Sequence, residues 1–158
     1  MCLTVGVARL RTVLVVQTFL PYPDYAQSAA VLDRQRLGKQ RVECLQIFNA
    51  LTVPGYGWGS HPAVRMWRGY EHELVRYTQA MCDEWTKRGY RDSVREKIGR
   101  RLLEVQGDIG GDRGAPPWLG RGDLHRSHRS NLVRKDPEWY APRFEAGLRA
   151  DLEYVWPV

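Results

Sequence analysis

The stretch VLDRQRLGKQRVECLQIFNAL, residues 31–51, has the spacing of an amphipathic helix. Its apolar residues recur at helical intervals, and they are Leu37, Cys44, Leu45, Phe48 and Leu51. This periodicity places them on one buried helix face. The helix is expected to begin before this stretch, where Asp24 or Ser28 can cap its first turn, because both side chains can accept a backbone N–H. We therefore predict a long helix through this region.

A second helix is indicated between residues 60 and 89. Its large apolar residues fall at steps of three and four, and they are Trp67, Tyr70, Leu74, Tyr77, Met81 and Trp85. Ser60 can cap its start, Pro62 suits the first turn and Gly89 suits the end. One continuous helix is the expected structure.

Shorter helices complete the pattern. They are indicated at about 94–105 and 123–134, and Asp136 begins a further capped turn. No alternating strand pattern of useful length follows residue 20. We expect an all-α fold, with a single compact domain of about four to five helices over residues 16–158.

Charge and cysteine usage narrow the class of protein. Lys and Arg total 24 against 18 Asp and Glu, which gives a net charge of +6 and a pI of about 9.5. This balance favours a nucleic acid partner. Cys2, Cys44 and Cys82 are scattered, which argues against a disulfide framework and a zinc site. We therefore expect the protein in a reducing cytoplasm. If it binds DNA, we expect it to associate with the nucleoid.

Residues 1–15 are interpreted as a misassigned or disordered N-terminal extension. The apolar run at 12–16 ends at Gln17. It is shorter than the roughly 7 to 15 residues of a secretory segment and the roughly 20 of a membrane span. No membrane association is expected. Our hypothesis is that Val16 is the true initiator, encoded by a non-AUG codon.

The segment LDRQRLGKQRVE, residues 32–43, is the first candidate site. Its cations are Arg34, Arg36, Lys39 and Arg41. Lys39 and Glu43 are four residues apart, so one interpretation is a surface ion pair worth less than about 1 kcal/mol. The alternative interpretation places Glu43 in a DNA-facing cleft surrounded by these cations.

A second candidate site follows the glycine-rich loop VPGYGWGSHP, residues 53–62. Arg65 and Arg68 lie off the apolar stripe and could reach phosphates. His61 could donate to a phosphate or to a flipped nucleotide, or it could simply cap the helix.

The basic segment GRGDLHRSHRSNLVRK, residues 120–135, is the third. Its candidate DNA-binding residues are His125, Arg126, Ser127, His128, Arg129, Ser130 and Lys135. Cations and hydroxyls together are typical of a surface that holds a sugar-phosphate backbone, although a solvated basic helix has the same pattern. A metal on the two histidines would lack the usual third protein ligand. Trp139 and Tyr140 could stack on bases or close the core.

Taken in order, these segments resemble the pyrimidine-dimer DNA glycosylase family, whose best-known member is the phage endonuclease V. The first helix matches the family's spacing at Gln35, Leu37, Glu43 and Phe48. The second helix is similar in the segment HPAVRMW and in Lys87-Arg88-Gly89-Tyr90. The C-terminal part resembles the family's basic helix and aromatic tail at His125, Ser127, Ser130, Leu132, Lys135, Trp139 and Tyr140. An uncharacterised bacterial branch that begins near Gln17-Thr18-Phe19-Leu20-Pro21 is more similar still.

The resemblance implies an all-α enzyme that acts on double-stranded DNA without metal or cofactor. In the family, an N-terminal α-amine attacks the sugar C1′, displaces the damaged base and forms an imine, after which β-elimination cleaves the strand. Glu43 falls on the catalytic glutamate, which stabilises the cationic sugar. The resemblance also makes Gln35 a candidate DNA contact.

The amine itself differs from the family pattern. The family exposes a terminal Thr amine about twenty residues before its glutamate, and Met1 lies far outside that distance. A start at Val16 brings the amine nearer and makes Gln17 a candidate. Lys39 is a possible substitute amine, and a glycosylase without lyase activity could instead use Glu43 to activate water.

Other functional classes stay open. No nucleophile elbow, P-loop, zinc-protease or dinucleotide motif occurs in the sequence. We expect the protein to be a monomer. Two alternatives to a glycosylase stay open: a non-catalytic helical module that binds DNA or RNA, and a helical protein that binds an acidic protein.

Overall fold

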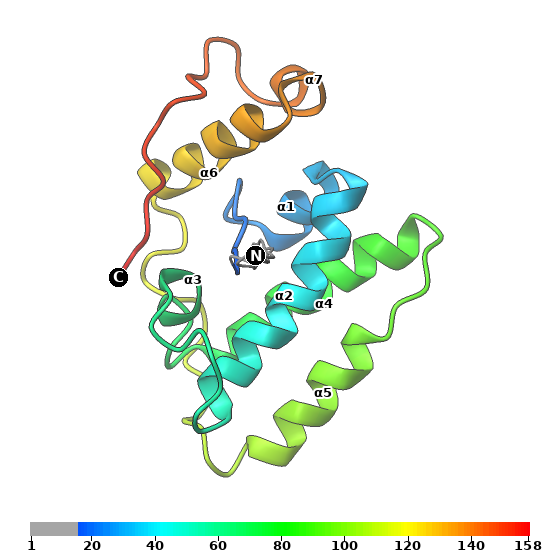
Figure 1. Cartoon of the computed structure of the whole chain (residues 1–158), viewed down its shortest axis with the longest axis vertical. Coiled ribbons are helices and arrows are strands. Elements are labelled where there is room, and N and C mark those ends of the chain that lie inside the picture. Colours follow the sequence, from blue (N-terminus) through cyan, green and yellow to red (C-terminus); the bar gives the residue numbers. More distant parts are fainter. Residues whose placement is uncertain (1–15) are drawn as a thin grey trace, which may run out of the picture.

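The computed structural model describes residues 16–158, and all regular structure in this range is helical (Figure 1). The elements are α1 (Tyr25–Val31), α2 (Arg34–Thr52), α3 (Pro62–Arg65), α4 (Glu71–Lys87), α5 (Val94–Val105), α6 (Gly122–Lys135), α7 (Pro137–Tyr140) and the 3-10 helix η1 (Ala141–Arg143). The predicted all-α fold in a single domain is confirmed. No helix of this range is long and apolar enough to cross a membrane. The extension predicted for residues 1–15 lies outside the described residues.

The first predicted helix is divided into α1 and α2. Asp24 caps α1 by accepting the Gln27 N–H at 2.8 Å. Leu32 is extended, with ψ at 137°, and Asp33 then starts α2 by accepting the Arg36 N–H at 3.1 Å. The expectation of one continuous helix is wrong here, because the Asp33 carboxylate captures a backbone N–H and restarts the helix.

The second predicted helix is also divided, into α3 and α4. His61, rather than Ser60, caps α3, because its Nδ1 accepts the Ala63 N–H at 3.1 Å. Gly69 has a φ of +82°, a left-handed conformation that favours glycine and interrupts the helix before α4. These two divisions explain why more helices are present than the four to five expected.

Helices α2 and α4 pack against each other at the centre, with α1 and α5 beside them (Figure 1). The largest fully buried side chains include Trp67, Tyr77, Tyr140, Phe48 and Leu37. Each such burial contributes roughly 1.5–3 kcal/mol. Gly38 of α2 lets the ring of Trp85 approach from α4, since a Cβ there would lie 3.0 Å from that ring.

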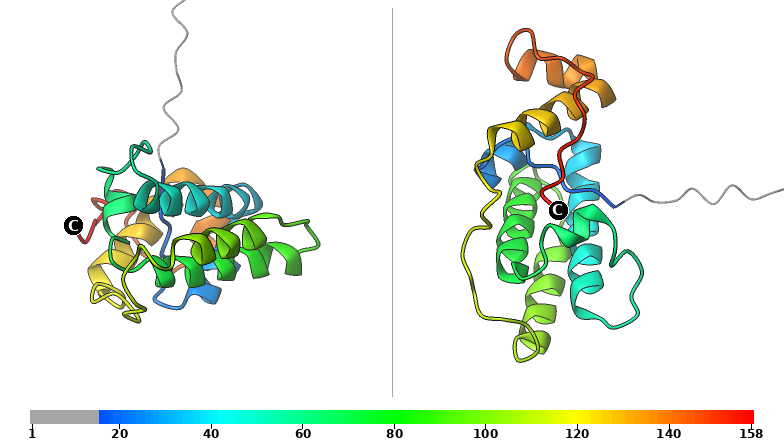
Figure 2. Two further views of the ribbon diagram at one scale, coloured as in Figure 1. Left: turned by 90° about the horizontal axis from the view of Figure 1, so that it is seen from below. Right: turned by 90° about the vertical axis from the view of Figure 1, so that its left-hand side faces the viewer.

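An extended segment, residues 16–20, runs between α6 and the central helices α2 and α4 (Figure 2). Its backbone groups are bonded by side chains rather than by a neighbouring strand. Gln40 of α2 accepts the Phe19 N–H at 2.9 Å and donates to the Gln17 carbonyl at 2.8 Å. Tyr77 of α4 donates its hydroxyl to the Phe19 carbonyl. Two central helices therefore fix this segment.

Side chains from the C-terminal half of the chain bind the other side of the segment. His128 Nδ1 accepts the Leu20 N–H at 3.0 Å, and His125 Nδ1 lies 2.8 Å from the Leu20 carbonyl oxygen. Tyr154 donates its hydroxyl to the Thr18 carbonyl at 2.6 Å. Nearly every buried backbone polar group of a folded chain needs such a partner, and these side chains supply them.

Candidate active site and DNA interface

Glu43 lies midway along α2, and only 4% of the residue is exposed. Its Oε1 atom is 3.4 Å from Lys39 Nζ. Its Oε2 atom is buried and has no hydrogen-bond partner among the described residues. Burial is the largest influence on this carboxyl group and raises its pKa. A buried acceptor without a partner costs roughly 1–3 kcal/mol, so stability alone does not explain this carboxylate.

Cations from two helices surround Glu43. Lys39 of α2 and Lys135 at the end of α6 both attract its negative charge and lower its pKa, although burial outweighs them. The Lys135 amine has a lowered pKa itself, first through burial and then through repulsion by Arg36 and Lys39. The predicted pair of Lys39 and Glu43 is present, but its carboxylate is buried and is not part of a solvated surface pair.

The extended segment reaches the same site. The backbone N–H of Gln17 lies close enough to Glu43 to lower the carboxyl pKa. The Tyr154 hydroxyl donates to the Thr18 carbonyl of this segment at 2.6 Å, and burial, followed by the charge of Glu43, raises its pKa. Sequence analysis did not identify Tyr154, and no local signal pointed to it, because it is 136 residues from its partner Thr18.

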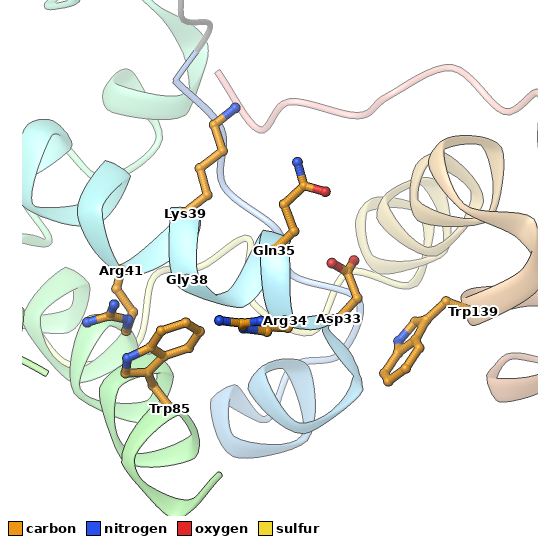
Figure 3. A pocket seen from close by; sticks show the side chains of 8 residues that line it. All are labelled: Asp33, Arg34, Gln35, Gly38, Lys39, Arg41, Trp85 and Trp139. Atoms are coloured by element: carbon orange, nitrogen blue, oxygen red, sulfur yellow. The ribbon is translucent and has the colours of Figure 1, made fainter. Parts of the chain in front are cut away.

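An open cavity of about 680 Å³ lies along the N-terminal half of α2 (Figure 3). It is lined by Asp33, Arg34, Gln35, Gly38, Lys39, Arg41, Trp85 and Trp139. In Figure 3, Gln35 and Lys39 extend to one side of α2, and Trp85 lies on the other side below Gly38. Trp139 faces α2 from α7. Lys39 thus borders both this cavity and Glu43.

Several predicted DNA-binding residues are exposed, as contact with DNA requires. They are Arg34, Gln35, Arg65, Arg68, Arg126 and Lys135. Arg68 also donates to the Gly59 carbonyl at 3.0 Å, which attaches the glycine-rich loop to the chain after α3. His61 is half-buried, and burial lowers its pKa, so its ring stays neutral at pH 7.

Other predicted contacts are engaged inside the protein. Arg41 is buried, pairs with Asp92 and lies 4.3 Å above the centre of the Trp85 ring. Tyr140 is fully buried and donates to Asp33. Arg41 and Tyr140, which were expected to contact DNA, are thus engaged inside the protein, and Arg41 also lines the open cavity.

Three more candidates are half-buried. Arg36 pairs with Asp33 at 2.8 Å, and Arg129 donates to the Pro21 carbonyl at 2.7 Å and pairs with Glu145. Trp139 donates to the Val31 carbonyl at 2.9 Å and lies under the Arg143 guanidinium. Their remaining exposed atoms leave a DNA contact open.

One face of α6 is buried where exposed DNA contacts were expected. It carries His125, Ser127, His128 and Ser130, which are each at most 2% exposed. The histidines bind residue 20, and the two serine hydroxyls accept backbone N–H groups of the C-terminal segment, residues 152–155. These four residues are therefore removed from the candidate DNA surface. The local pattern could not reveal this, because their partners lie far away in the sequence.

Within residues 16–158, no group of three or more His, Cys, Asp and Glu side chains is arranged to hold a metal ion. The side chains described above at the candidate site are the buried Glu43 carboxylate and the amine of Lys39, with Trp85 and Trp139 along the cavity. None of the curated proteins and none of the solved structures matches the chain. The family described as pyrimidine dimer DNA glycosylase matches residues 16–97, just over half of the sequence. This range contains the extended segment, Lys39 and Glu43. The chain therefore belongs to the pyrimidine dimer DNA glycosylase family.

Proposed function

We propose that this protein is a DNA glycosylase that excises a damaged base, a pyrimidine dimer by family, from double-stranded DNA, with Glu43 as its catalytic carboxylate. Family membership supports the reaction class and the DNA substrate. The role of Glu43 rests on one observation, its buried Oε2 atom without a hydrogen-bond partner. Among the described residues, Arg41 Nε and Asn131 Oδ1 are also buried without a partner, and Glu43 is the only carboxylate of the three. Unpartnered buried polar groups are rare, and an active site is one of the places that retains them.

The surroundings of Glu43 suit departure of a base. Cleavage of the bond between base and sugar leaves positive charge at C1′. A carboxylate in a buried site attracts that charge more strongly than a solvated one does. The raised pKa of Glu43 also brings the group nearer to the pH range in which it can exchange protons with a reacting amine or water.

Lyase activity requires a neutral amine next to Glu43. We propose the α-amine of a chain that begins at residue 16, because the neighbouring Gln17 backbone N–H already lies near the carboxylate. Such an amine titrates at about 7.7–8.0, well below lysine. Lys39 and Lys135 are the alternatives, and the lowered pKa of Lys135 favours it over an ordinary lysine. Mass spectrometry of the N-terminus of the native protein tests the proposed start, and a peptide beginning at residue 1 would contradict it.

Exposed cations and one exposed glutamine provide the proposed DNA surface. Arg34 and Gln35 lie on α2, Arg65 and Arg68 in or beside α3, and Lys135 at the end of α6. Arg and Lys contacts to phosphate supply most of the affinity for duplex DNA. Affinity should therefore fall steeply with rising salt.

The decisive experiment is a base-release assay combined with borohydride trapping on duplexes that contain a pyrimidine dimer. We expect Glu43→Gln to reduce turnover by at least about a thousand-fold, the scale of removing an electrostatic catalytic group, while DNA affinity stays within a few-fold. Glu73→Gln is the matched control, because Glu73 is a buried glutamate of α4 that pairs with Arg76. It should keep its turnover.

Trapping identifies the amine. Borohydride reduces an imine to a stable cross-link, and peptide mapping then distinguishes the α-amine from Lys39 and Lys135. Base release without a cross-link would favour water activated by Glu43. Salt-sensitive DNA binding with neither signal would refute the enzyme and favour a non-catalytic DNA-binding module.

A further inference from the structure

A strained tryptophan lies in the glycine-rich loop between α2 and α3. Trp58 has a φ of +76°, and it is the only non-glycine residue of positive φ in residues 16–158. This conformation is unfavourable for a bulky side chain and persists where the surroundings impose it, often at functional sites. A Cβ on Gly57 or Gly59 would meet no atom within 4 Å beyond its chain neighbours, so there is open space beside the loop backbone. The Trp58 side chain itself is half-buried and packs against the edge of the core.

Trp58 begins a row of aromatic rings that leads to the extended segment. Its ring centre is 6.1 Å from that of His61, in an edge-to-face arrangement at 79°. His61 meets Trp156 at 6.0 Å, and Trp156 meets Tyr154 at 4.6 Å. The last ring in the row, Tyr154, donates its hydroxyl to the Thr18 carbonyl at 2.6 Å. The row of rings therefore links the loop to the extended segment, residues 16–20.

Positive charge accompanies this indole. Arg68 donates to the carbonyl of Gly59, the residue that follows Trp58, and is otherwise exposed. Arg65 of α3 is exposed as well. Proteins hold single-stranded or extrahelical nucleotides by stacking the base on an aromatic ring and pairing its phosphate with Arg or Lys. The loop presents both groups.

We propose that Trp58 stacks on a nucleobase that is unpaired at the damaged position of the duplex, and so helps the enzyme to distinguish damaged from intact DNA. This role rests on the proposed function, because it assigns a specificity element to the same substrate. Arg68 donates one hydrogen bond to the Gly59 carbonyl and so holds the loop. Its other N–H groups can then bind the phosphate of the stacked nucleotide. The row from Trp58 to Tyr154 then connects base recognition with the extended segment.

Binding measurements test this role without requiring turnover. The probes are a duplex with one unpaired 2-aminopurine and the same duplex fully paired. Wild-type protein should prefer the first duplex and should quench its 2-aminopurine fluorescence. Trp58→Ala should reduce that preference about 10-fold, within the range reported for loss of one stacked base, whereas Trp58→Phe should largely retain it.

Two further variants separate stacking from folding. Trp58→Gly removes the ring and is compatible with a positive φ, so it should fold normally and still lose the preference and the quenching. Tyr56→Ala removes an exposed aromatic residue of the same loop and should change neither. An unchanged preference in Trp58→Gly, or an equal loss of affinity for both duplexes, would overturn the proposed stacking while leaving the glycosylase intact. If the wild-type protein binds neither duplex, the proposed function fails as well.

Discussion

The extended segment of residues 16–20 and the glycine-rich loop between α2 and α3 are held in opposite ways. Residues 16–20 are extended, and side chains from α2, α4, α6 and the C-terminal segment bind their backbone groups. The loop of residues 53–61 has open space around Gly55, Gly57 and Gly59, and it is attached by the bond from Arg68 and by the half-buried Trp58 ring. We infer from this contrast that residues 16–20 form the more rigid of the two segments and that the glycine-rich backbone of the loop is the more adaptable.

The largest expected effect in this comparison concerns Gln40. Replacing Gln40 by Leu removes the partners of the Phe19 N–H and the Gln17 carbonyl and leaves both without a bond. We expect the free energy of unfolding to fall by about 3 kcal/mol, because each orphaned buried group costs roughly 1–3 kcal/mol. Urea denaturation measures this change. Gln35→Leu, an exposed glutamine of the same helix, should change it by less than about 0.5 kcal/mol. Equal effects would show that the segment is not specifically held.

The histidines that hold residue 20 should make the protein sensitive to acid. Burial lowers the pKa of His128 to about 3, below the ordinary value of 6.5. The unfolded chain therefore binds a proton that the folded chain excludes, and stability is lost as the pH falls from 6.5 toward 3. We expect a decrease of up to about 1.4 kcal/mol per pH unit from this residue. His125, whose pKa is also lowered, adds to the decrease.

Denaturation curves between pH 6.5 and 4.5 test this slope. Asp33 and Asp92 have pKa values lowered from 3.8, so their contribution to acid sensitivity falls below this window. His128→Asn should flatten the curve, even if it lowers stability at pH 7. A wild-type stability that is constant from pH 6.5 to 4.5 would show that the two imidazoles are not held in the neutral form.

The smallest effect is expected in the loop. Gly57 does not have a positive φ, and a Cβ there would meet no atom within 4 Å. Gly57→Ala should leave the free energy of unfolding unchanged or raise it by less than about 1 kcal/mol, because alanine restricts the unfolded chain. Thermal denaturation of Gly57→Ala and of the wild-type protein under the same conditions measures this difference. A loss above 2 kcal/mol would mean that the loop is specified as tightly as residues 16–20, and the comparison would fail.

The sequence predicted what short-range patterns can encode. Apolar spacing located the central helices, and the all-α fold follows from it. The breaks before Asp33 and at Gly69 were missed, because each depends on one residue whose cap or φ outweighs the periodicity on both sides. Family spacing identified Glu43 as the candidate carboxylate, and the structure places it in a buried position, while its catalytic role stays a prediction.

The supports of the site could not be predicted in the same way. His125 and His128 resemble solvated helix residues until the backbone of residue 20 is placed beside them. Tyr154 has no local signal, because its partner Thr18 lies 136 residues away. Buried polar residues of this kind are determined by long-range hydrogen bonds, and single-sequence periodicity carries no information on those.

The distant partners of residues 16–20 also set an order of events during synthesis. The bonds from His128 and Tyr154 close over 108 and 136 residues, so the ribosome must translate most of the chain before they can form. At roughly 5–20 residues per second, the emerging segment waits on the order of ten seconds without these partners. Nascent chains that stop before α6 would carry Glu43 but lack the bonds from His125, His128 and Tyr154 to residues 16–20. The enzyme should therefore become active only late in translation, when the last helices join the first segment.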